Sequence, residues 1–111
     1  MTEKTSDKRL GSMIGLAYKA GRIRSGGFAA EESVRSGTAK LCMVSGDTSE
    51  GTMKKFKDMC SHKSIPMVLM DISKEELGHM MGKDLRSVVT VEDEGFAKRI
   101  LELIEGGNAC G

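Results

Sequence analysis

Apolar residues recur along this chain with a helical period in some segments and in short unbroken runs in others. Four apolar residues near the N-terminus follow the i, i+3, i+4 and i+7 spacing of an amphipathic helix: Leu10, Met13, Ile14 and Ala17. Ser6 or Asp7 is available to cap the start of this helix, and Gly21 is available to end it. The pattern therefore predicts a first helix that stops before residue 21.

Four short segments predict strands, at residues 22–25, 40–45, 67–70 and 87–91. Two of them, 40–45 and 67–70, contain unbroken apolar runs, which are typical of strands covered on both faces. We expect these two strands at the centre of a sheet.

Helices are predicted between the strands. Gly26-Gly27 leads into a second helix that ends at Gly37. Residues 47–50 give a cap and an acidic first turn to a third helix. The apolar face of this third helix consists of Met53, Phe56 and Cys60.

Two further helices start at recognisable caps. Ser73 and Glu76 form a capping box, and Asp93 caps the last helix. This alternation of helices and strands predicts an α/β fold, a three-layer α/β/α sandwich with a four-stranded mixed sheet. With 111 residues, we expect one domain over residues 1–111, with an ordered core of about residues 7–105.

No segment indicates a membrane or a secreted protein. The longest apolar runs have four residues, whereas a membrane-spanning helix needs about 20. Residues 1–9 are polar and do not resemble a secretory signal. The three cysteines lack CxxC spacing and are interpreted as reduced thiols, with Cys42 acting as a small buried hydrophobic residue. We predict a cytoplasmic protein.

Charge is distributed unevenly, although the net charge is only +1. Residues 1–40 carry eight Lys or Arg and four Asp or Glu, whereas residues 71–111 carry five and nine. The basic half fits a phosphate-binding surface, and ordinary solvated lysines and arginines are the alternative.

Residues that would indicate catalysis are missing. Ser25-Gly26-Gly27-Phe28 has glycines but lacks the Lys-Ser/Thr of a nucleotide-binding loop. Asp47 follows an apolar strand, where α/β enzymes keep carboxylates, but we prefer a helix cap for it. Cys60 and His62 could begin a metal site, yet no familiar spacing supplies the other ligands. We predict no enzymatic activity, no metal and no cofactor.

One feature remains that could bind an anion. Because Gly26-Gly27 opens the second helix, its first N–H groups point outward and can donate to a phosphate. Arginine and lysine residues near in sequence supply positive charge: Arg22, Arg24, Arg35 and Lys40. A turn before any helix would use the same two glycines, so this motif leaves both interpretations open.

Several stretches in order resemble a known family: IGLAYKAG (14–21), RSGG (24–27), VRSGTAKLCMVSGD (34–47), SIPM (64–67), SKEELGHMMGKDLRSVVTV (73–91) and DEGFAKRI (93–100). Together they resemble the bacterial YlxQ-type branch of the kink-turn-binding ribosomal proteins, the superfamily of archaeal L-seven-Ae and eukaryotic L-thirty-e. The resemblance covers about residues 10–104 and implies the same α/β/α fold.

This resemblance also implies an RNA site. Family members bind sharply bent RNA with the start of the second helix and a loop after the fourth. On this chain that site would comprise Arg24, Ser25, Gly26, Gly27, Phe28, Glu32, Arg35, Lys74, Lys83, Leu85 and Arg86. Gly26 would approach the bent backbone, Lys74 would lie near an extruded nucleotide, and residues 83–86 would cover that nucleotide.

The helix start departs from the archaeal pattern. Phe28-Ala29 replaces an Asn-Glu pair, and Glu32 replaces a lysine. Base-edge contacts are therefore lost, and Glu32 would repel phosphate unless it faces solvent or pairs with Arg35. Phe28 could stack on an unpaired base or simply pack.

We therefore predict an RNA-binding, ribosome-associated protein that recognises bent or bulged, kink-turn-like RNA mainly by shape and backbone. Its expected partner is structured RNA, ribosomal or other non-coding, with the ribosome or ribosomal proteins as a further expected partner, and neither a membrane nor DNA is expected. The alternative is a protein-interaction module on the same fold with reduced RNA affinity.

Overall fold

The computed structural model describes the backbone of residues 3–109 and the side chains of residues 8–105. The described helices are α1 (Glu3–Lys19), α2 (Gly27–Arg35), α3 (Glu50–Lys63), α4 (Lys74–Met80) and α5 (Glu94–Ala109). The described strands are β1 (Ile23–Ser25), β2 (Leu41–Ser45), β3 (Met67–Met70) and β4 (Val88–Val91). None of the described helices has both the length and the apolar character needed to cross a membrane.

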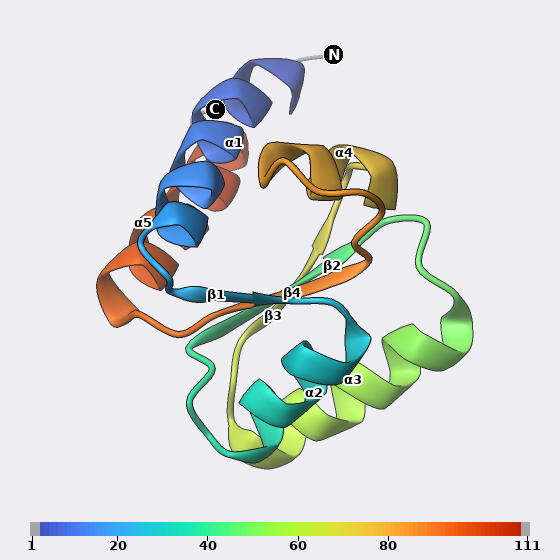
Figure 1. Ribbon diagram of the computed structural model, residues 1–111. Coiled ribbons are helices and arrows are strands. Elements are labelled where there is room, and N and C mark those ends of the chain that lie inside the picture. Colours follow the sequence, from blue (N-terminus) through green and yellow to red (C-terminus); the bar gives the residue numbers. More distant parts are fainter. Residues whose placement is uncertain (1–2, 110–111) are drawn as a thin grey trace.

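The four strands form one sheet in the order β1-β4-β2-β3. β2 runs parallel to β3, whereas β4 runs antiparallel to both β1 and β2. Figure 1 shows α1, α4 and α5 on one face of the sheet and α2 and α3 on the other. The predicted α/β/α sandwich with a four-stranded mixed sheet is confirmed.

The sheet separates two hydrophobic clusters. Successive residues of a strand point to opposite faces, so β2 contributes to both clusters. Leu41 and Met43 pack toward α1, α4 and α5, and Cys42 and Val44 pack toward α2 and α3, where Phe56 is buried. Every residue of β2 is buried, as predicted for a central strand.

The helix starts confirm some predicted caps and correct others. Ser73 and Glu76 form the predicted capping box, and Asp93 accepts a backbone N–H at the start of α5. The cap predicted for the first helix is wrong: α1 begins at Glu3, and residues 6 and 7 lie inside it. No glycine or proline interrupts residues 3–9, so the helix continues past the first capping residues. Within the segment 47–50, it is Ser49 that caps α3.

The position predicted for β3 is also wrong. This strand lies at an edge of the sheet, with β2 as its sheet neighbour, rather than at the centre. Met67 and Val68 are only half-buried against the two clusters, and Leu69 is 55% exposed. An apolar run alone does not reveal whether a second strand covers it.

Candidate nucleic-acid interface

The N-terminus of α2 presents the backbone N–H donors of its first turn. Gly26 is the N-cap, and no side chain among the described residues caps this helix. Its carbonyl accepts the first intrahelical hydrogen bond, from the Ala30 N–H at 2.9 Å. The N–H groups of Gly27, Phe28 and Ala29 precede that donor and point out of the helix end. The first turn contains no acidic residue, so this end of the helix dipole is open to an anion.

Glycine is required at position 26 by its backbone conformation. Its φ of 99° and ψ of 153° lie in a region that residues with a Cβ rarely adopt. The Gly26 N–H donates to the Val88 carbonyl at 3.0 Å, which ties the start of α2 to β4. At Gly27 the φ is negative and an added Cβ would meet no atom within 4 Å. The two glycines therefore differ: the first fixes the turn, and the second leaves open space.

A loop from the other end of the chain lies beside this helix start. The Arg86 Nε donates to the Ser25 Oγ at 3.2 Å, although the two residues are 61 positions apart. The Arg86 backbone N–H donates to the Lys74 carbonyl at 3.0 Å, and its Nη1 donates to the Leu85 carbonyl at 2.9 Å. Arg86 thus connects the start of α2, the start of α4 and the α4–β4 loop.

Two apolar side chains on this surface are exposed. Phe28, in the first turn of α2, is 85% exposed, and Leu85, in the α4–β4 loop, is 56% exposed. The alternative that Phe28 packs within the protein is therefore excluded, as far as the described side chains are concerned. Glu32 is exposed as well, four residues after Phe28 and so on the same side of α2.

The backbone of the α4–β4 loop packs directly against Gly78 of α4. An added Cβ at Gly78 would overlap the Asp84 carbonyl and would lie 3.2 Å from the Arg86 nitrogen. The Gly78 carbonyl also accepts the Lys83 N–H at 2.9 Å. The loop backbone approaches this closely only because the helix has no side chain there.

Asp47 holds the start of α4 in place. Its Oδ1 accepts hydrogen bonds from the Ser45 hydroxyl and the Lys74 backbone N–H, both at 2.9 Å. These hydrogen bonds, the one from Ser45 foremost, lower the pKa of the Asp47 carboxyl, although burial acts to raise it. The interpretation of Asp47 as a cap of the third helix is wrong, because Ser49 caps α3. The Asp47 carboxylate instead accepts a backbone N–H of the first turn of α4, whose N-cap is Ser73.

The profile of the ribosomal protein L7Ae/L30e/S12e/Gadd45 family matches residues 8–101. The chain belongs to this family. The RNA-binding protein YlxQ of Enterococcus faecium is 39% identical over 106 residues, 96% of this chain and 100% of that protein. YlxQ of Bacillus subtilis (strain 168) is 34% identical over 93 residues, covering 84% and 92%.

A solved structure gives independent support for the fold of this L7Ae/L30e/S12e/Gadd45 family member. The Giardia lamblia 15.5kD RNA binding protein superimposes with a TM-score of 0.76, covering 96% of this chain and 91% of its own. Its identity is 18%, so this likeness concerns the fold alone. The resemblance stated from the sequence is confirmed at the level of the family.

The structure brings some of the predicted site residues together. A surface around the start of α2 and the α4–β4 loop, here called the helix-start surface, contains Ser25, Gly26, Gly27, Phe28, Glu32, Leu85 and Arg86. Lys74 reaches it through its backbone. Lys83 precedes Leu85 in the same loop, but its Nζ lies 5.7 Å from the centre of the Tyr18 ring on α1.

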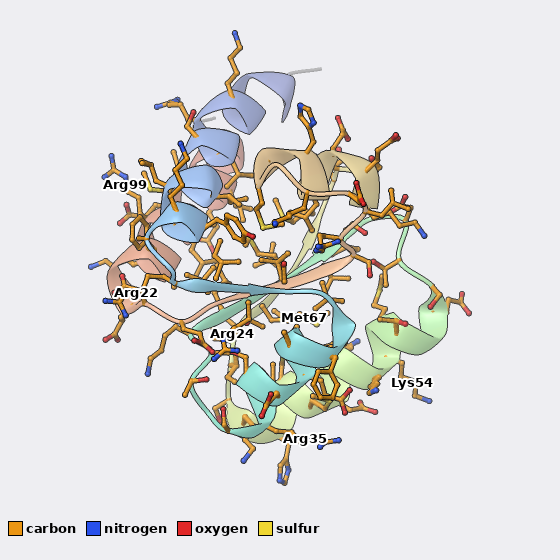
Figure 2. The ribbon with its side chains drawn as sticks, viewed as in Figure 1. Arg22, Arg24, Arg35, Lys54, Met67 and Arg99 are labelled. Carbon is orange, nitrogen blue, oxygen red and sulfur yellow. The ribbon has the colours of Figure 1, made fainter. Side chains whose placement is uncertain are left out.

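Other predicted cations lie away from the first turn of α2. Arg24 pairs with Glu92 at 3.5 Å. Arg35 ends α2 and pairs with Glu31 at 2.6 Å, rather than with Glu32, the partner considered as one alternative. Figure 2 shows Arg22, Arg24 and Arg35 apart from the helix start. Arg22 and Lys40 directly precede the strands β1 and β2 and are exposed.

Two glutamates that hold these cations were missed from the sequence. Glu92 accepts hydrogen bonds from the Ser33 and Thr38 hydroxyls at 2.6 and 2.8 Å. Burial acts to raise the pKa of Glu92, but these hydrogen bonds and the Arg24 charge outweigh it and lower the pKa. Glu31 binds Lys55 of α3 at 2.8 Å. The sequence does show that Glu92 directly follows a predicted strand, which is one signal for a functional carboxylate. Its partners could not be predicted, because they are distant in sequence.

The two cysteines that the structure describes are buried thiols. Cys42 and Cys60 are 0% and 1% exposed, whereas His62 is exposed on α3. Cys60 and His62 were considered together as the start of a metal site. Because one is buried and the other is exposed, they do not lie in a common site. The interpretation of Cys42 as a small buried hydrophobic residue is confirmed.

Proposed function

We propose that this protein binds structured RNA at the helix-start surface, with a preference for bent or bulged RNA of the kink-turn kind. The observation that carries this proposal is the hydrogen bond from Arg86 to Ser25. It joins an uncapped helix N-terminus to a loop with an exposed apolar side chain. Phosphate donors and a base-contacting surface are then adjacent, as recognition of a bent strand requires.

Each part of the surface supplies a different kind of contact. The first N–H groups of α2 would donate to a phosphate, with the helix dipole favouring the negative charge. Arg86, held by Ser25, would add a guanidinium beside the same backbone. Phe28 would stack on an unpaired base, because it is 85% exposed and has no core to pack into.

Support for RNA as the ligand comes from the relatives. Two YlxQ proteins with 39% and 34% identity carry the description RNA-binding protein. On this chain, Phe28 and Glu32 offer no donor for a base edge, so recognition would rest on shape and backbone more than on sequence. Ribosome association and a cytoplasmic, non-catalytic role are part of the same proposal.

A protein-interaction module on this fold is the second candidate. Glu32 favours it, because an exposed carboxylate one turn from the helix start opposes a phosphate. The two functions differ in how they respond to salt and to reversal of this charge.

Salt dependence provides the first test. The logarithm of the affinity for a kink-turn RNA fragment is expected to fall linearly with the logarithm of the salt concentration. The slope should be about −0.7 to −0.9 for each phosphate contact. Gel-shift titrations at several salt concentrations measure this slope, with an unbent duplex of equal length as the comparison RNA. If this protein binds both RNAs no more tightly than a neutral control protein does, the RNA proposal fails and the protein-interaction module becomes the favoured function.

The Glu32→Lys variant provides the second prediction. Because the side chain lies on the face of α2 that carries Phe28, the change converts a repelled charge into an attracted one. We expect RNA binding to tighten by about 1 to 2 kcal/mol at low salt and by less at high salt.

Isothermal titration with one RNA measures the effect of this charge reversal. Glu102→Lys is the matched control, because Glu102 is an exposed glutamate on α5, across the sheet from α2. It changes the net charge equally and should tighten binding far less. Equal effects of the two variants would show that only overall charge matters and would remove Glu32 from the interface.

A further inference from the structure

Within residues 3–109, β3 has a strand partner on one side only and leaves a row of backbone groups on the other. It pairs with β2 and ends the sheet order. The Cys42 N–H donates to the Pro66 carbonyl, so the even-numbered residues of this segment face β2. Met67 and Leu69 therefore turn their N–H and C=O groups away from the sheet. Such a row is a template for another strand.

The side chains of β3 are unusual for a free edge. Exposed edge strands normally carry a charge or a proline that blocks pairing. All four residues of β3 are apolar, Leu69 is 55% exposed, and Pro66 lies just before the strand. Leu69 lies on the same face as Met67, which is only half-buried. The edge is thus both open for hydrogen bonding and incompletely covered on its faces.

The two ends of β3 carry opposite charges. Lys63 closes α3 just before the strand, and Asp71 follows it directly. Both side chains are exposed. An antiparallel copy of this strand would bring the Lys63 end of one chain to the Asp71 end of the other, so that opposite charges meet at each end of the pair.

From this edge we infer that β3 pairs with β3 of a second copy of this chain, antiparallel and about a two-fold axis. In the register that uses the outward groups, Met67 lies opposite the partner's Leu69, and Leu69 lies opposite the partner's Met67. Each of these pairs exchanges two hydrogen bonds. Val68 meets its own copy on the other face. The interface is isologous and closes after two chains.

This pairing leaves the helix-start surface free. Gly26 follows β1, which lies at the opposite edge of the sheet from β3. Three strand steps of about 4.8 Å separate the two edges. The inference therefore does not depend on the RNA proposal, and loss of the dimer is expected without loss of the RNA site.

Sedimentation equilibrium over a wide range of concentrations tests the inference directly. The parent chain is expected to form a concentration-dependent dimer. Leu69→Lys should raise the dimer dissociation constant by about tenfold or more, because a charge is placed in an apolar strand pair. Leu16→Lys is the matched control, since Leu16 is 56% exposed on α1 and lies outside the edge. It should leave the dissociation constant unchanged.

A charge swap separates this dimer from other assemblies. Lys63→Glu and Asp71→Lys should each weaken the dimer, and the double variant should restore it. Amide hydrogen exchange of Met67 and Leu69 should also slow as the protein concentration rises. A parent chain that stays monomeric, a dimer that tolerates Leu69→Lys, or a double variant that is not restored would each overturn the inference.

Discussion

The Gly27→Glu variant is expected to bind structured RNA about 10- to 100-fold more weakly than the parent chain while folding at least as well. An added Cβ at this position meets no atom within 4 Å, and the φ of Gly27 is not positive. A carboxylate in the first turn is favourable for a helix by about 0.3 to 1 kcal/mol. The same charge would repel a phosphate at the open N–H groups. Fold stability and RNA affinity should thus move in opposite directions.

Gly51→Glu is the matched control for this effect. Gly51 lies in the first turn of α3, is exposed, and also has open space for a Cβ. The variant has the same added charge and the same dipole benefit at a different helix start. Fluorescence anisotropy with labelled RNA, together with thermal melts, measures both quantities. Similar RNA affinities of the two variants would mean that the start of α2 does not bind phosphate.

The fold was predictable wherever the signal is local. Ser73 and Glu76 lie three residues apart, so their mutual capping is visible in the sequence. The buried face of α3, with Phe56 and Cys60, follows from helical periodicity. The position of β3 was not predictable in this way. Its apolar run satisfies the pattern of a central strand, and only the pairing of distant segments decides which strand lies at the edge.

The candidate site was predictable in its first half only. The two glycines Gly26-Gly27 indicate a helix start without a capping side chain. From this local signal the N–H groups of the first turn can be inferred to be available. The second half depends on contacts between residues far apart in sequence. Arg86 reaches Ser25 across 61 residues, and Asp47 reaches Lys74 across 27. Charge clustering in residues 1–40 likewise gave no sign that Arg24 pairs with Glu92, a residue of the acidic half.

The Gly78→Ala variant is expected to lower the free energy of unfolding by about 1 to 3 kcal/mol and to weaken RNA binding as well. Alanine is the better helix former by about 1 kcal/mol, so propensity alone predicts stabilisation. The added Cβ, however, would overlap the Asp84 carbonyl, and backbone atoms cannot rotate away as a side chain can. The α4–β4 loop must shift, and Arg86 would lose its position beside Ser25.

Gly11→Ala separates the loop contact from helix propensity. Gly11 also lies within a helix, but the atoms nearest to its added Cβ would be those of the flexible Met80 side chain, at 3.4 Å or more. This variant should therefore be up to about 1 kcal/mol more stable than the parent. Urea unfolding measures both changes, and anisotropy with a kink-turn RNA measures the consequence for binding. The free energy of unfolding should fall in Gly78→Ala and rise in Gly11→Ala. Only Gly78→Ala should also bind the RNA more weakly. A stabilised Gly78→Ala chain with parental RNA affinity would show that the loop is not seated on Gly78 as the structure has it.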